Sequence, residues 1–212
     1  MKPLRMTTLL LLAVALPTFG FDDKKADFVP IVKGNDISQF ELVKLDGDSM
    51  TITDGEVRLT GSPAGYFATK ASYKDYTLVF DWMYERPADL KSDAAFQGNS
   101  GCLVHVVPPL KVWPKSIEVQ LANADAGHIF AIDGKFKGKK DAQAQGKAIK
   151  PVGQWNHEEV TCKAGAISCK INDILIDSGT GADPAEGRIA WQSEGGAIRF
   201  REIKIRVLKD SD

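Results

Sequence analysis

Two short stretches of this chain carry most of its potential for acid–base chemistry. Residues 102–107 and 116–121 are mostly apolar and flank a proline-stiffened loop, so they predict two neighbouring β-strands. Side chains two positions apart on a strand share a face. Glu118 and Gln120 therefore point away from the apolar side of their strand, and His105 shares a face with Leu103. An acid, an amide and an imidazole on one polar surface suit a ligand rich in hydroxyl groups.

Glu118 is the best candidate for a general acid or base, because a carboxylate on a surface backed by a core can be held in place. The alternative is a cross-strand ion pair on a solvated face. Trp113 lies in the loop between the two strands, and an aromatic ring at that place is expected to stack on a ligand.

Arg201 lies where the alternation of the last predicted strand changes phase. Ile198 and Phe200 share one phase, whereas Ile203 and Ile205 share the other. One extra residue near Arg201 would restore the pattern, so a β-bulge is predicted there, and bulges can re-aim a side chain at a site. The alternative is a strand that twists and begins again on another sheet.

The composition excludes some classes of protein. The chain has 212 residues, with 27 basic and 28 acidic side chains, and this balance argues against nucleic-acid binding. Residues 1–20 combine Lys2 and Arg5 with the apolar run 9–16 and small residues near position 20, as in a signal peptide. That run is too short to span a bilayer. We expect an exported protein, secreted or periplasmic, with residues 21–212 as a single domain; an uncleaved anchor is the alternative.

The remaining sequence predicts an all-β fold. Helical periodicity is nearly absent, and about a dozen short apolar or alternating runs lie between turn signals. Asp54-Gly55, Asp133-Gly134 and Gly165 are predicted to form hairpins. Many short strands with short connections are typical of a β-sandwich or barrel. The lysine-rich stretch 134–153 is predicted to be a polar surface loop.

The cysteines and histidines are the residues that could form a disulfide or bind a metal ion. A turn at Gly165-Ala166 would place Cys162 opposite Cys169, and an oxidising compartment would permit a disulfide between them. A reduced pair is the alternative, and Cys102 is expected to be a small buried hydrophobe. The three histidines lack metal-ligand spacing. No glycine-rich phosphate loop opens a helix, so no metal or cofactor is predicted.

Five motifs occur in order along the chain. They are Asn99-Ser100-Gly101, Glu118-Val119-Gln120, Gly153-Gln154-Trp155-Asn156, Gly187-Arg188-Ile189-Ala190-Trp191-Gln192 with Gly195-Gly196, and Phe200-Arg201-Glu202-Ile203. Their order and spacing resemble the 3-keto-disaccharide hydrolase domain family, over residues 34–207. The resemblance implies a concanavalin A-like jelly-roll sandwich, related in shape to lectins and glucanases, and a carbohydrate ligand.

The resemblance also implies a reaction. A ketone at the third carbon of a sugar acidifies the proton on the second carbon; its removal gives an enolate that can expel the glycosidic oxygen, after which water adds back. Such a route needs a base and a group that holds the enolate oxygen. Glu118 is expected to be the base, with Arg201, His105 or Gln120 as electrophilic support.

Three motif residues, Asn99, Gln120 and Gln192, are expected to bind the sugar, together with Trp113 and Glu194, which lie outside the motifs. Glu194 is the one obvious second acid for a conventional two-carboxylate hydrolase. A non-catalytic carbohydrate-binding module of the same fold is the main alternative. A secreted interaction domain without a sugar site is a third, because the fold alone does not decide among them.

Overall fold

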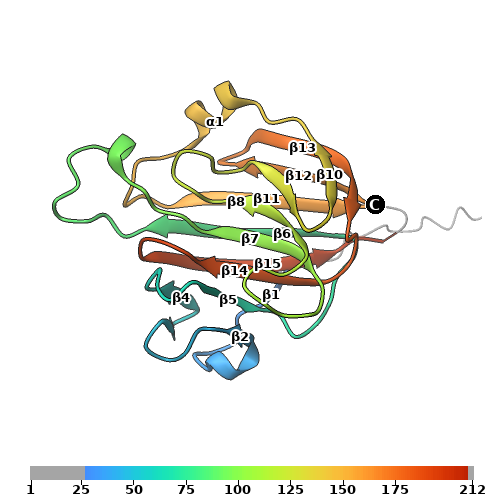
Figure 1. Ribbon diagram of the computed structural model, residues 1–212, viewed down its shortest axis with the longest axis horizontal. Coiled ribbons are helices and arrows are strands. Elements are labelled where there is room, and N and C mark those ends of the chain that lie inside the picture. The colour runs from blue at the N-terminus through green and yellow to red at the C-terminus, as the bar shows by residue number, and fades with distance from the viewer. Residues whose placement is uncertain (1–26, 210–212) are drawn as a thin grey trace, which may run out of the picture.

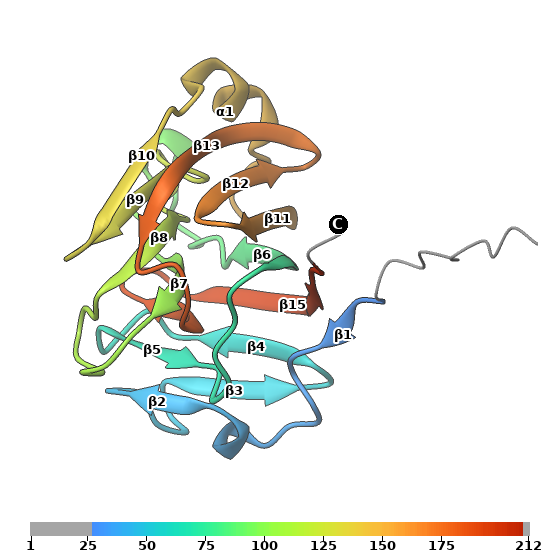
Figure 2. The ribbon, with the colours of Figure 1, turned by 90° about the vertical axis from the view of Figure 1, so that its right-hand side faces the viewer.

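The computed structural model describes residues 27–209, which form two antiparallel β-sheets packed against one another. Figure 1 shows most strands of both sheets lying along one common axis across the molecule. Figure 2 shows β7, β8 and β9 on one side and β11, β6 and β15 on the other. The leader predicted at residues 1–20 lies outside the described residues. The predicted all-β sandwich is confirmed.

Nine strands form the larger sheet, in the order β10-β13-β12-β11-β6-β15-β4-β3, with β1 added beside β15. Their bounds are β1 Val29–Pro30, β3 Met50–Thr53, β4 Glu56–Leu59, β6 Tyr76–Tyr84, β10 Lys135–Gly138, β11 Asn156–Lys163, β12 Ala166–Ile171, β13 Ile174–Asp183 and β15 Ile198–Val207. The smaller sheet has the order β2-β5-β14-β7-β8-β9. Its strands are β2 Glu41–Val43, β5 Gly65–Ala68, β7 Gly101–Val106, β8 Ser116–Gln120, β9 Ile129–Ile132 and β14 Arg188–Ser193.

The main core lies between the two sheets. Trp191 of β14 stacks on Phe67 with 5.0 Å between ring centroids, and it meets Phe80 of β6 edge-on at 6.1 Å. This contact joins the smaller sheet to the larger one, and all three rings are fully buried. Offset and edge-to-face aromatic pairs add to the stabilisation that burial of their area provides. The inner faces of both sheets therefore fix their relative position.

Two-residue turns connect several neighbouring strands of the larger sheet. Asp54-Gly55 joins β3 to β4 and has positive φ at both positions, 50° and 79°, as a tight hairpin requires. Ala164-Gly165 does the same between β11 and β12, with φ of 50° and 77°. Asp133-Gly134 behaves differently from the prediction, because the strand that follows it, β10, pairs with β13 of the other sheet.

The predicted Cys162–Cys169 pairing is wrong. The turn at Ala164-Gly165 lies one residue earlier than expected, which moves the cross-strand partner by two positions. Cys162 is therefore opposite Ile167, and Cys169 is opposite Val160. All three cysteines, Cys102 included, are free thiols in the buried core. Burial raises the pKa of the Cys162 thiol to about 12, which makes it a poor nucleophile.

Helical structure is confined to short segments. They are η1 Ile37–Gln39, η2 Asp93–Ala95 and α1 Ala142–Ala148. The helix α1 lies in the stretch predicted as a polar loop, and Asp141 caps it by accepting hydrogen bonds from the backbone N–H groups of Gln143 and Ala144 at 2.9 and 3.0 Å. Among residues 27–209, none of the helices has the length and apolar character needed to cross a membrane.

A second, smaller apolar cluster lies on the outer face of the six-stranded sheet, which points away from the larger sheet. Tyr66, Leu103 and Ala190 belong to it, and Leu110 and Trp113 from the loop 107–115 pack over it. A sheet that buries both of its faces needs such a cover. The loop also shields the polar side chains that share this face.

Candidate functional site

Glu118 lies on the outer face of the six-stranded sheet, in register between Leu103 of β7 and Phe130 of β9. Its neighbours in β8, Ile117 and Val119, belong to the main core. The side chain is only 4% exposed. Among the described residues no lysine, arginine or histidine forms an ion pair with it. Its one side-chain partner is Gln192, whose Nε2 donates to Oε2 at 3.2 Å.

This setting raises the pKa of Glu118 to about 7. Burial is the main cause, and the nearby carboxylate of Glu194 acts in the same direction, whereas the hydrogen bond from Gln192 opposes both. A carboxyl group that titrates near neutrality can accept or give up a proton under ordinary conditions, which is the property required of a general acid or base.

Gly101 of β7 leaves the space that Glu118 and Gln192 occupy. A Cβ at this position would stand 2.4 Å from Gln192 Oε1 and 2.6 Å from Glu118 Oε1. Both distances are shorter than any ordinary contact. The glycine in the first sequence motif is therefore explained by the two polar side chains that converge over it.

Glu194 and Trp113 complete this group from two different segments. Glu194 directly follows β14 and is half-buried, and burial raises the pKa of its carboxyl group, although a hydrogen bond from Trp113 opposes the shift. Trp113 is partly exposed, and its ring lies 6.3 Å from that of Tyr66. The structure thus brings together four of the predicted residues, Glu118, Gln192, Glu194 and Trp113.

Tyr66 belongs to the same group and was not predicted from the sequence. It lies directly opposite Gln192 in the pairing of β5 with β14. Tyr66 Oη and Gln192 Oε1 are both buried, and neither has a hydrogen-bond partner among the described residues. Burial raises the pKa of the Tyr66 phenol to about 12, so it remains a hydrogen-bond donor. An unpaired buried donor and acceptor are costly, and they mark a place where a polar ligand can bind.

Asn99 and Gln120 lie beside this group and line a neighbouring depression of about 410 Å³. Gln120 Oε1 accepts hydrogen bonds from the backbone N–H groups of Leu121 and Ala122 at 2.9 and 2.8 Å. Asn99 forms a bridge with Gly195, the residue after Glu194, through a 2.8 Å backbone hydrogen bond. These amides extend the polar surface beyond Glu118.

The predicted position of His105 is wrong. Val104 packs in the main core and Val106 in the outer cluster, although residues two apart on a regular strand share a face. The strand therefore contains one extra residue, a β-bulge, between them. His105 is that residue: its φ is 57°, and the register with β14 shifts at this point. The imidazole consequently packs against Tyr76 of the larger sheet, 5.8 Å between ring centroids. It lies in the core and not beside Glu118.

Arg201 also lies away from Glu118, although the bulge predicted beside it is confirmed. The register of β15 with β6 shifts between Arg201 and Lys204, and Glu202 has a φ of 53°. The bulge leaves Arg201 on the outer face of the larger sheet. There its Nε donates to Asp81 at 3.1 Å and its guanidinium stacks on Trp155, 4.0 Å from the ring centroid. Its predicted role as electrophilic support for Glu118 therefore has no geometric basis.

His128 is a further residue of the outer face that the sequence reasoning missed. It ends the turn between β8 and β9, and its ring packs against Phe130 at 5.4 Å between centroids. Its Nδ1 lies 2.9 Å from Asp125 Oδ2, and Lys140 binds the same carboxylate. Phe130 is the cross-strand partner of Glu118. A histidine contributed by a turn has no strand periodicity, so only the fold could place it here.

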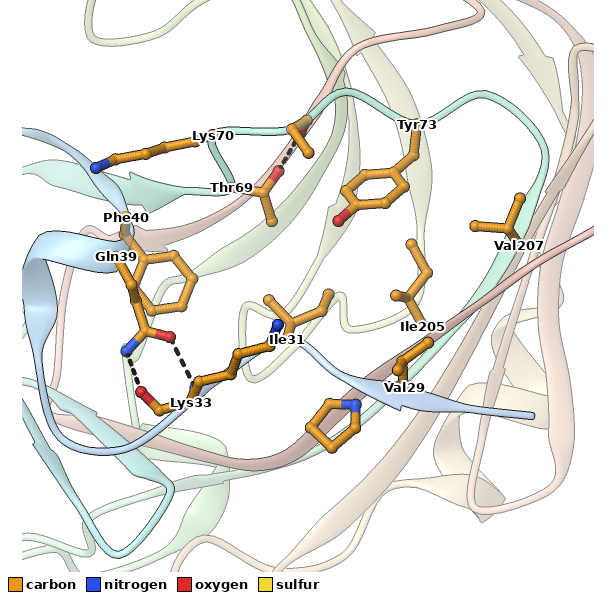
Figure 3. Close-up of a pocket in the computed structure, with 12 residues that line it drawn as sticks. Val29, Ile31, Lys33, Gln39, Phe40, Thr69, Lys70, Tyr73, Ile205 and Val207 are labelled. Atoms are coloured by element: carbon orange, nitrogen blue, oxygen red, sulfur yellow. Dashed lines mark hydrogen bonds between the residues drawn. The ribbon is translucent and has the colours of Figure 1, made fainter. Parts of the chain in front are cut away.

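Another depression, of about 390 Å³, lies beside β1 (Figure 3). Its walls are mostly apolar and include Val29, Ile31, Ile205 and Val207, with Lys33 and Lys70 at its rim. No acid or histidine lines it. This depression therefore lacks a carboxylate or imidazole base, in contrast to the surface around Glu118. Among residues 27–209, no three His, Cys, Asp or Glu side chains gather as they would around a metal ion.

Comparisons with solved structures define the class of fold. A candidate glycosyl hydrolase from Parabacteroides distasonis is 20% identical with a TM-score of 0.64, over 86% of this chain and 100% of that one. A second from the same organism is 22% identical with a TM-score of 0.63, over 86% and 94%. A Bacillus subtilis protein with a galectin-like fold is 9% identical with a TM-score of 0.59, over 88% and 99%. The protein is thus a lectin- and glucanase-like β-sandwich, as predicted.

The family follows from the sequence. The chain belongs to the 3-keto-alpha-glucoside-1,2-lyase-like domain family, whose model matches residues 27–206. The family suggested by the five motifs is therefore confirmed. Among curated proteins, none is similar enough to match this chain.

Proposed function

We propose that this protein is an exported enzyme that cleaves glycosidic bonds in 3-keto-glycosides, with the sugar bound on the outer face of the six-stranded sheet. Membership of the lyase-like family supports the substrate class. The observation that carries the proposal is Glu118, a buried carboxyl group that forms no ion pair with the described residues and has a pKa of about 7. It contacts Gln192, and both Gln192 and the neighbouring Tyr66 carry unpaired polar atoms. This combination has no evident value for stability, because each of these groups costs free energy to bury.

Glu118 is the base in this proposal. It removes the proton from carbon 2 of the sugar, which the ketone at carbon 3 acidifies, and the electrons move to the carbonyl oxygen to give an enolate. The ketone then re-forms, a double bond appears between carbons 1 and 2, and the glycosidic oxygen leaves carbon 1. Addition of water returns a hydroxyl group to carbon 1 and the proton to carbon 2. A base that titrates near neutrality suits both proton transfers.

Tyr66 takes the role of electrophilic support that the sequence analysis gave to Arg201, His105 or Gln120. Its buried phenol O–H has no partner among the described residues, and it stands across from Gln192, which itself contacts Glu118. A donor placed in advance near a developing oxyanion stabilises the transition state more than the ground state. The partly exposed ring of Trp113 gives the sugar an apolar surface on which to stack.

The test is turnover of a chemically prepared 3-keto-disaccharide by the wild type and by Glu118→Gln. Glutamine keeps the shape and the hydrogen bond with Gln192 but cannot accept the proton. We expect turnover to fall by about 10²-fold or more, the usual contribution of a general base, with substrate still bound. Glu159→Gln is the matched control: Glu159 pairs with Lys170 at 2.8 Å on the outer face of the larger sheet, so turnover should not change.

A carbohydrate-binding module without catalysis is the second candidate, favoured by the Trp113 ring and the amide-lined depression of Asn99 and Gln120. The same assay distinguishes the two. If the wild type binds the disaccharide and releases no product, the binding module replaces the enzyme. If it turns the substrate over and Glu118→Gln does so equally fast, another group is the base.

A further inference from the structure

We infer that His128 is the general acid that protonates the leaving oxygen, and that the substrates are therefore glycosides with an unactivated sugar or alkyl leaving group. This inference rests on the proposed function. A departing sugar alkoxide is strongly basic and needs a proton as the bond to carbon 1 breaks, whereas Glu118 is already committed to the proton of carbon 2. A second proton-transfer group must then stand on the same face.

The contacts of His128 fit it for that role. Asp125 is held ionised: burial alone would raise the pKa of its carboxyl group, but hydrogen bonds from Lys140 and His128 outweigh it, and the pKa is lowered. An ionised carboxylate 2.9 Å from Nδ1 requires the proton on that nitrogen. Within residues 27–209 the imidazole has no other side-chain hydrogen bond, so Nε2 remains available to a ligand.

The position of His128 relative to Glu118 follows from the strand register. Phe130 is directly opposite Glu118, and the backbone N–H of Gln120 donates to His128 O at 2.9 Å, which continues the same ladder. His128 is therefore a diagonal neighbour of Glu118, and such pairs have Cα atoms about 7–8 Å apart. The ring contact with Phe130 places the imidazole on the outer face. The two side chains therefore emerge from neighbouring positions on the same face of the sheet.

The proton balance closes with these two residues. In the elimination, Glu118 gains the proton of carbon 2 while His128 Nε2 gives a proton to the oxygen that leaves carbon 1. In the hydration, His128 takes a proton from the water that attacks carbon 1, and Glu118 returns its proton to carbon 2. The sum is one 3-keto-glycoside plus water giving one 3-keto-sugar and one alcohol, with both side chains restored.

His157 provides a matched control within the same chain. Its Nδ1 lies 2.8 Å from Asp81 Oδ1, so it forms the same kind of histidine–aspartate pair. It stands on the outer face of the larger sheet, with its side chain 46% exposed, beside Arg201 and away from Glu118. Replacing either histidine by asparagine removes an imidazole that an aspartate holds. We expect His128→Asn to affect the reaction and His157→Asn to leave it unchanged.

The experiment compares two substrates, a 3-keto-disaccharide and the 3-keto derivative of 4-nitrophenyl glucoside, whose phenolate leaves without protonation. We expect His128→Asn to lose about 10²-fold or more in kcat on the disaccharide and less than tenfold on the nitrophenyl substrate. His157→Asn should match the wild type on both, and Glu118→Gln should fail on both.

Two results would overturn the assignment of His128: an equal loss on both substrates, or full turnover of the disaccharide by His128→Asn. Absence of product from the wild type with either substrate would instead overturn the proposed function itself. The two failures are thus distinguishable in one set of assays.

Discussion

Two glutamates of this protein, Glu118 and Glu158, are both buried but lie in different parts of the fold. Glu158 of β11 is fully buried between the sheets, and Glu118 of β8 is buried on the outer face of the smaller sheet. Burial raises the pKa of Glu158 to about 8 and is also the main reason that the pKa of Glu118 is about 7. Neither has an ion-pair partner among the described residues.

Glu158 and Glu118 differ in the hydrogen-bonding groups around their carboxyl oxygens. Both oxygens of Glu158 have a partner inside the core: Trp82 Nε1 donates to Oε2 at 2.8 Å, and Cys169 Sγ donates to Oε1 at 3.6 Å. Glu118 instead lies among groups with unused hydrogen-bonding capacity, Tyr66 and Gln192. A perturbed pKa alone therefore does not mark a reactive site. The useful sign is a perturbed acid next to polar atoms that lack partners.

The largest effect expected from this comparison is on stability, at Glu158. Its folded-state pKa is raised above the unfolded value of 4.5, so the stability it contributes is fully present below pH 4.5 and is lost as pH rises through 8. The loss is roughly 5 kcal/mol between these limits. Glu158→Gln, which stays neutral, should unfold at higher urea concentration than the wild type at pH 9 and at nearly the same concentration at pH 5, with turnover at pH 7 unchanged. An identical pH dependence in both proteins would show that Glu158 does not titrate.

A smaller effect, on turnover, is expected at Gly101, which lies next to the side chains of Glu118 and Gln192. Gly101→Ala would push against Gln192 and Glu118, so turnover should fall by about tenfold to 10²-fold through displacement of the base. Gly146→Ala is the control, since a Cβ there meets nothing within 4 Å and alanine favours the helix α1. Equal turnover in Gly101→Ala and wild type would mean that the position of Glu118 is not critical.

Sequence reasoning predicted the parts of the site that an uninterrupted alternation controls. Glu118 lies on the expected face because β8 has a regular period of two, with Ile117 and Val119 in the core. His105 was misplaced because a bulge with φ of 57° changes the phase of β7 by one residue, and only the register with its neighbour reveals it. The fold class and the family were both predictable from the strand pattern and the five motifs.

The other site predictions that failed, and the site residues that were not predicted, depend on long-range strand pairing and on turns. The phase change near Arg201 correctly indicated a bulge, but the sequence around it does not specify which sheet the strand joins. The Cys162–Cys169 pairing failed because a turn shifted by one residue moves every partner by two. Tyr66 lies opposite Gln192, and His128 lies two residues from the cross-strand partner of Glu118, through pairings that only the fold establishes. Such pairings depend on the whole fold and leave no local signal.

The most direct test of the central claim is the pH dependence of kcat/KM for the 3-keto derivative of 4-nitrophenyl glucoside. This substrate needs no protonation of its leaving group, so the profile reports the base alone. If Glu118 with a pKa of about 7 is that base, kcat/KM should fall tenfold per pH unit below pH 7 and level off above it. Glu118→Gln should lack this limb and Glu158→Gln should keep it. A profile that is flat from pH 5 to 8, or a limb that survives in Glu118→Gln, would contradict the account.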